Sequence, residues 1–235
     1  MNFKLPAAAL ALLFAISISA AAQSKEPDLS GVWQAPYTPN LAEVLGRELP
    51  FTAYGLARAR AVDFSKDPTG FCLPPGPARS IQAPMPFQIV QTPGVVVLAF
   101  EYQRIFRLIY TDGSTHPPGM DENPEFMGHS IGKWEGDTLI VDTIGIDDRT
   151  WLDTAGHEHS GKLHLTERFR KTGPDTIQWT ASFDDPLFFT EVFTITRNLT
   201  RQKTRILDYS CNENNKDLAH VQPTIGIPGL PPAGK

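Results

Sequence analysis

The sequence predicts an all-β protein, an antiparallel β-barrel of about nine strands preceded by an irregular N-terminal arm. Two observations carry this prediction. After Pro86, apolar and β-branched runs alternate with turn signals rich in Gly, Pro and Asp. The short spacings between these runs favour antiparallel hairpins over parallel crossovers. Closure into a barrel would remove exposed sheet edges, and a two-sheet β-sandwich is the alternative.

The expected strands follow one another through a barrel domain spanning residues 87–215. Each combines apolar or alternating residues with a turn signal at its end. The predicted strands are residues 87–91, 95–102, 104–110, 129–134, 138–144, 162–171, 176–183, 190–198 and 204–209.

The segment 23–86 is interrupted by many prolines and predicts an arm packed on the barrel. Within it we expect one short strand at 31–34 and one helix at 52–62, with Thr52 as the N-cap. The final residues, 216–235, have no apolar periodicity and predict a flexible tail.

Residues 1–22 have the order of a secretory signal peptide: Lys4, an apolar run and then small residues ending at Ala22. The apolar run is shorter than a membrane-spanning helix requires, and no later segment is comparably apolar. We therefore expect an exported protein, periplasmic or secreted, with no membrane span after signal removal.

The composition indicates an ordinary globular surface, with 20% charged residues and a net charge of -5. This charge excludes the basic footprint of a nucleic-acid-binding protein. The chain has only two cysteines, Cys72 and Cys211. Because exported proteins meet an oxidising compartment, these cysteines are expected to form a disulfide.

A long motif, FMGHSIGKWEGDTLIVDTIG at 126–145, resembles a large family of exported bacterial proteins of unassigned activity. The segments at 27–33, 71–76, 86–92 and 211–215 are similar to the same family. The resemblance implies export and this fold, and it implies no particular chemistry. Separately, Gly31-Val-Trp33 is similar to the Gly-x-Trp opening of lipocalins, which implies a lipocalin-like (calycin-like) barrel that holds one small ligand.

Alternation in the strand 162–171 places Glu167 on the apolar, inward face. A buried carboxylate must be paired or hydrogen-bonded, so Glu167 is a candidate catalytic residue or one half of a structural ion pair with an arginine. Similar reasoning makes Glu101 and Glu191 candidate ligand contacts. Across the hairpin turned at 135–137, His129 and Asp142 are neighbours in the predicted register, and they could form an acid/base pair.

The loop 146–160 is unusually rich in polar residues and is expected to lie over the barrel mouth. Trp151, Asp147 and Asp153 are its candidate ligand contacts, and His157 is a candidate catalytic base. The pair His157-x-His159 could also hold a divalent metal, completed by Asp153, His116 or His129. The structural alternative is a loop held by its own hydrogen bonds.

These observations favour a barrel that binds a small, mostly apolar ligand in its interior. The alternative is a lyase, isomerase or hydrolase that uses His and carboxylate chemistry in the same barrel. A third reading is a secreted interaction module. No cofactor is expected, because the sequence lacks the glycine-rich phosphate loops that bind nucleotides, and a divalent metal is a minor possibility.

Overall fold

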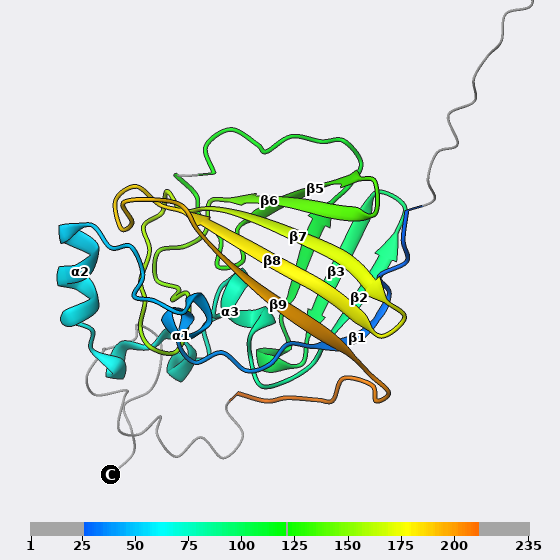
Figure 1. Ribbon diagram of the computed structural model, residues 1–235, viewed down its shortest axis with the longest axis horizontal. Helices are drawn as coiled ribbons and strands as arrows, with labels where there is room; N and C mark the ends of the chain where they lie inside the picture. The colour runs from blue at the N-terminus through cyan, green and yellow to red at the C-terminus, as the bar shows by residue number, and fades with distance from the viewer. Residues whose placement is uncertain (1–25, 121, 212–235) are drawn as a thin grey trace, which may run out of the picture.

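The computed structural model describes residues 26–120 and 122–211, so the predicted signal peptide and flexible tail lie outside the described residues. The chain forms a closed nine-strand barrel, which confirms the predicted fold class (Figure 1). Its strands are β1 (Gly31–Gln34), β2 (Phe87–Thr92), β3 (Val95–Phe100), β4 (Phe106–Tyr110), β5 (His129–Glu135), β6 (Thr138–Ile144), β7 (His164–Gly173), β8 (Thr176–Asp184) and β9 (Phe193–Gln202).

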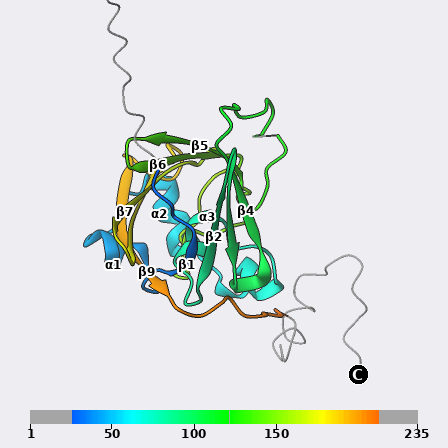
Figure 2. The same ribbon diagram turned by 90° about the vertical axis from the view of Figure 1, so that its right-hand side faces the viewer.

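Strand order around the barrel follows the chain, and β1 pairs with β9 to close it. All pairs are antiparallel except β4 and β5, which pair in parallel through Ile109 with Ser130 and Tyr110 with Ile131. The prediction of a fully antiparallel barrel was therefore wrong at this pair. The reason is the long connection after β4, which arches outside the barrel and lets β5 begin beside the last residues of β4 and run in the same direction (Figure 2).

The ninth strand is not the predicted one. Residues 204–209 have no strand structure, which corrects that prediction. The short strand predicted at 31–34 within the arm is present as β1, and it supplies the closing strand of the barrel. Trp33 of β1 is fully buried, and its indole N–H donates to the Leu29 carbonyl at 2.9 Å. The arm is thus built into the barrel wall at its beginning.

Side chains fill the barrel interior. Inward positions alternate with outward ones along each strand, so that β8 buries Ile177, Trp179, Ala181 and Phe183 while the residues between them are partly exposed. Phe183 stacks on Phe193 with ring centroids 4.8 Å apart. The interior is therefore a packed core, as small barrels of this strand number commonly have.

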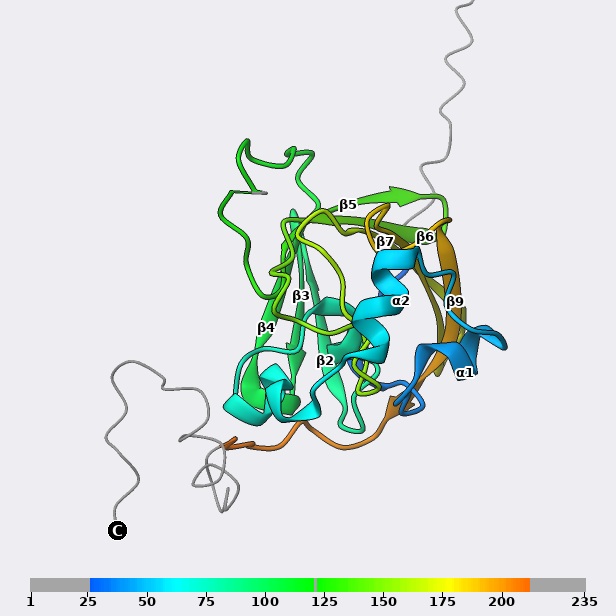
Figure 3. The same ribbon diagram turned by 90° about the vertical axis from the view of Figure 1, so that its left-hand side faces the viewer.

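One end of the barrel is covered by short helices and by the chain between β6 and β7 (Figure 3). The helix α2 lies in the predicted 52–62 segment, and Thr52 caps it by accepting from the Gly55 N–H at 3.0 Å. The covering helices are α1 (Leu41–Leu45), α2 (Ala53–Arg60) and α3 (Pro77–Ile81), with 3-10 turns η1 (Phe64–Lys66), η2 (Pro68–Phe71) and η3 (Tyr102–Arg104).

Helix α3 is the most deeply placed of these covering elements. All five of its residues are buried, and Ile81 belongs to the hydrophobic core. Its first residue, Pro77, suits the first helical position, where no backbone N–H is needed.

The predicted disulfide is present. Cys72 and Cys211 are bonded across a sequence separation of 139 residues. The bond fixes the chain that follows β9 against the covered end, where Tyr209 also packs edge-on against Tyr102.

We expect the Cys72→Ser, Cys211→Ser double variant to lose about 2–4 kcal/mol of unfolding free energy, because the bond restricts the unfolded chain over a long loop. Urea unfolding of the oxidised protein and of the variant measures this loss. Equal midpoints would contradict it.

Candidate functional site

Glu167 lies on the inward face of β7, as alternation predicts, and is fully buried. Its carboxylate accepts from the guanidinium of Arg107 on β4, which is 1% exposed. The indole N–H of Trp179 donates to the other Glu167 oxygen at 3.0 Å. Both carboxylate oxygens are therefore engaged within the core.

Two hydroxyls extend this network. Arg107 Nε donates to Ser130 Oγ at 2.9 Å, and Arg107 Nη2 donates to Thr143 Oγ1 at 2.7 Å. A buried ion pair is tolerated only with such supporting hydrogen bonds. Glu167 thus acts as one half of a structural pair that ties β4 to β7 through the barrel interior.

His129 and Asp142 lie on the outer face of the barrel. The predicted register was one residue off, because His129 pairs with Ile144 and Asp142 pairs with Ile131. The observed register puts both side chains on the same face. Asp142 hydrogen-bonds His164 Nε2 from β7, and no direct His129–Asp142 bond is present.

His116, from the chain between β4 and β5, connects the two. Its Nδ1 lies 2.9 Å from His129 Nδ1, and its Nε2 lies 3.9 Å from Asp142 Oδ1. Burial lowers the pKa of His116, although the nearby Asp142 carboxylate acts to raise it. On its other side, His129 stacks on Tyr110 with ring centroids 5.3 Å apart. From the sequence, His116 is only an optional metal ligand, and no local pattern places it beside Asp142.

The polar residues of the loop 146–160 are used mainly to hold the loop itself. Asp147 accepts from Arg149, which lowers the pKa of the Asp147 carboxyl. Asp153 accepts from the Leu41 backbone N–H at 2.7 Å and lies 2.6 Å from His157 Nδ1. These contacts favour the structural alternative for Asp147, Asp153 and His157.

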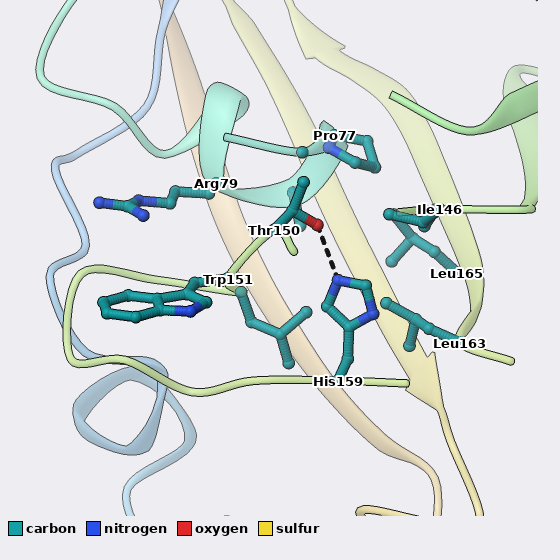
Figure 4. A pocket seen from close by; sticks show the side chains of 11 residues that line it. Pro77, Arg79, Ile146, Thr150, Trp151, His159, Leu163 and Leu165 are labelled. Atoms are coloured by element: carbon teal, nitrogen blue, oxygen red, sulfur yellow. Dashed lines mark hydrogen bonds between the residues drawn. The ribbon is translucent and has the colours of Figure 1, made fainter. Parts of the chain in front are cut away.

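His159 points from the loop into a small cavity of about 10 Å³ between α3 and β7 (Figure 4). Its Nε2 lies 2.7 Å from Thr150 Oγ1, and its Nδ1 lies 2.8 Å from the Ser160 carbonyl. Burial lowers the pKa of His159. Because both ring nitrogens are engaged, the structure does not present His157 and His159 as a metal-binding pair.

The other predicted ligand contacts lie apart from one another. Trp151 is buried, with Phe64 edge-on at 6.2 Å and the Arg79 guanidinium at 6.0 Å. Glu101 and Glu191 do not face the barrel interior, which corrects their prediction. Glu101 follows β3 and accepts from the Leu207 N–H at 2.8 Å, whereas Glu191 precedes β9, is 57% exposed and pairs with Arg47.

A pocket of about 140 Å³ lies at the covered end of the barrel. It forms where the segment after β1, helix α3, the turn after β3 and the 145–163 chain meet. Its lining includes Tyr37, Tyr102, Gln82, Arg79 and Thr154. Sequence reasoning missed this pocket, because four segments far apart in the chain form it and none carries a motif.

Two polar groups give the pocket its character. Gln82 is 2% exposed, and its Oε1 has no hydrogen-bond partner among the described residues. Arg79 makes a two-bond ion pair with Asp67 at 2.7 and 2.8 Å. Burial acts to raise the pKa of Asp67, but this guanidinium and the hydrogen bonds from Thr69 together lower it below its usual value. The pocket is therefore close to neutral, and one acceptor without a partner lies buried in its wall.

No family model, curated protein or solved structure matches the chain. The described residues contain no helix long and apolar enough to cross a membrane. Two places in the described residues have the geometry of a functional site, the outer-face histidines and the pocket.

The Arg107–Glu167 pair gives a stability prediction. Glu167→Leu leaves the Arg107 charge buried without its partner, so it should lower the unfolding free energy by about 3–5 kcal/mol. The Arg107→Met, Glu167→Leu double variant should recover most of that loss, because no unpaired charge remains. Urea unfolding of both variants measures the difference. A double variant no more stable than Glu167→Leu would show that the ion pair is not the cause.

His159 gives a pH prediction. Its folded pKa is lowered below the unfolded value of 6.5, so the unfolded chain binds the proton first as pH falls. The contribution of neutral His159 to the unfolding free energy is complete above about pH 6.5. Below that pH the unfolding free energy declines, by at most about 1.4 kcal/mol per pH unit. Unfolding measured from pH 7.5 to 5.5 should show this slope, and His159→Gln should make it shallower. An unchanged slope in the variant would assign the pH dependence to other groups.

Proposed function

We propose that this protein binds a small, uncharged and mostly apolar molecule in the pocket at the covered end of the barrel. The single observation that carries the proposal is a pocket of about 140 Å³ whose lining contains a buried, unpaired acceptor, Gln82 Oε1. The sequence predicts a ligand inside the barrel. We place the ligand at the covered end instead, because side chains fill the interior.

The volume defines the size of the ligand. An apolar cavity of roughly 150 Å³ accepts a benzene-sized molecule, so this pocket suits a single six-membered ring with a small substituent. The Tyr37 and Tyr102 side chains and Pro84 contribute flat or apolar surface to the lining. A ring is therefore the favoured ligand shape.

Gln82 defines the polar requirement. A buried acceptor without a partner costs free energy. A ligand hydroxyl or N–H would recover that cost once the Gln82 side chain turns Oε1 out of the pocket wall toward the ligand. Arg79 adds no free charge, because Asp67 engages it from the other side. A ligand with one donor and no charge is thus the best match, and a phenol or a small heterocycle has this chemistry.

Tyr37 and Thr154 form a contact between two sides of the pocket. Tyr37 Oη lies 3.2 Å from Thr154 Oγ1, and Thr154 Oγ1 donates to the Pro39 carbonyl at 3.0 Å. Both Tyr37 and Thr154 line the pocket, so this contact joins the segment after β1 to the 145–163 chain beside the ligand space.

An exported setting is part of the proposal. The Cys72–Cys211 disulfide supports an oxidising compartment, and the N-terminal sequence pattern supports a signal peptide. The long motif at 126–145 supports membership in a family of exported bacterial proteins. Binding at the covered end would then take place outside the cytoplasm.

The test uses phenol and toluene as matched probes, because they share a ring and differ in the hydrogen-bond donor. Phenol should bind with one-to-one stoichiometry and up to about tenfold more tightly than toluene, the worth of one neutral hydrogen bond. Gln82→Leu should remove that preference and leave toluene binding in place. Ligand-observed NMR titration measures both affinities.

Two alanine substitutions separate pocket binding from surface adsorption. Ala83→Leu adds bulk to the pocket lining and should weaken both probes, whereas Ala57→Leu adds the same bulk on the exposed surface of α2 and should change neither. Binding that survives Ala83→Leu, or a phenol preference that survives Gln82→Leu, would overturn the proposal.

A further inference from the structure

A cluster of three histidines and one aspartate lies on the outer face of β5, β6 and β7, away from the pocket. Its members are His116, His129, Asp142 and His164. In the barrel registers, His129 on β5 lies opposite Ile144 of β6, and Thr143 pairs with Leu165, the residue after His164. His129 and His164 therefore flank the same position of β6 from its two sides. Two strand spacings separate their backbones by roughly 9–10 Å.

Asp142 lies on the middle strand, two residues before Ile144 and on the same face. Its Oδ1 hydrogen-bonds His164 Nε2 and lies 3.9 Å from His116 Nε2. His116 comes from the chain between β4 and β5, which arches beside β5 and β6 in Figure 1. The cluster thus has a carboxylate from the central strand, one imidazole from each flanking strand and a third imidazole from the connection.

Several contacts in the cluster involve atoms that are good metal ligands. The 2.9 Å contact between His116 and His129 joins two Nδ1 atoms, so one ring must donate while the other accepts. His116 Nε2 is buried and has no hydrogen-bond partner among the described residues. The described residues therefore leave one imidazole nitrogen of the cluster, His116 Nε2, without a hydrogen-bond partner.

We propose that His116, His129, Asp142 and His164 bind one first-row transition-metal ion of the Zn²⁺ or Co²⁺ type. Imidazole nitrogens with a single carboxylate suit these ions, whereas Ca²⁺ and Mg²⁺ prefer all-oxygen sites. This site differs from the His157-x-His159 pair that the sequence suggested, and it does not depend on the ligand proposed for the pocket.

Binding requires side chains to rearrange, because no group of three such side chains among residues 26–120 and 122–211 is already gathered around one point. Tetrahedral ligands about 2.0–2.1 Å from zinc lie roughly 3.3 Å from one another. His116 faces His129 through Nδ1 and Asp142 through Nε2, and one imidazole offers an ion only one nitrogen. The His116 ring must therefore turn, and the other three side chains must close around the nitrogen that it offers. His116 lies outside the sheet, and the His164 and Asp142 side chains are 44% and 42% exposed, which leaves them room to turn.

Cobalt titration of the full chain, produced without a polyhistidine tag, tests this site. One Co²⁺ per chain should bind and give the visible absorption of a tetrahedral nitrogen and oxygen site. Zn²⁺ should displace it and raise the unfolding temperature, and a chelator should reverse that rise. His164→Asn and Asp142→Asn should each weaken Co²⁺ binding at least tenfold. Both side chains are partly exposed, so both variants should keep the fold, which circular dichroism checks.

His157→Gln is the matched control, because it removes a histidine from the other predicted metal pair. It should leave the cobalt spectrum and affinity unchanged. Binding that is lost in His157→Gln and retained in His164→Asn would move the ion to the 157–159 segment and overturn the proposal. A folded wild-type chain that takes up no Co²⁺ or Zn²⁺ would overturn it as well.

Discussion

Barrel closure by β1 is the constraint on which the rest of the structure depends. Only four residues, Gly31–Gln34, pair with β9 on one side and β2 on the other. Once the ring of strands is closed, every inward side chain shares one interior that must be filled without voids. Trp33 contributes from the closing strand itself, so the residue that completes the wall also fills the space behind it.

The filled interior determines where function can lie. Inside the barrel, Arg107 and Trp179 engage both carboxylate oxygens of Glu167 and leave neither for a ligand, whereas Arg107 Nη1 has no hydrogen-bond partner among the described residues. Binding chemistry is therefore confined to the ends and the outer face. The pocket beside Gln82 forms at the covered end, and the histidine cluster forms where a connection folds over the outer surface.

Alternation along single strands could be predicted from the sequence. The inward position of Glu167 follows from β7 alone, because a period of two fixes the face of each residue once the strand is recognised. Glu191 shows the limit of this reasoning. Its apparent alternation with Phe193 begins before the strand does, and the chain at Glu191 is still a bend in which the side chain reaches Arg47.

Contacts between distant segments could not be predicted from the sequence in the same way. The β5–β6 register differs from the predicted one by a single residue, and this difference determines which residue lies opposite His129. His116 lies in the cluster because the connection between the parallel strands β4 and β5 brings it there. The pocket depends on four segments between Tyr37 and Thr154 that no local pattern relates. These positions follow from tertiary packing, which local propensity does not encode.

The two proposed sites differ in how firmly the fold holds them, and this difference bears on their chemistry. The pocket is lined by α3, which is buried along its whole length, so its shape is fixed before a ligand arrives. Three of the four cluster residues lie on the rigid sheet, whereas His116 lies on the connection. A metal ion would therefore draw three side chains together from a fixed backbone and recruit the fourth, and it would fasten the β4–β5 connection to the barrel wall.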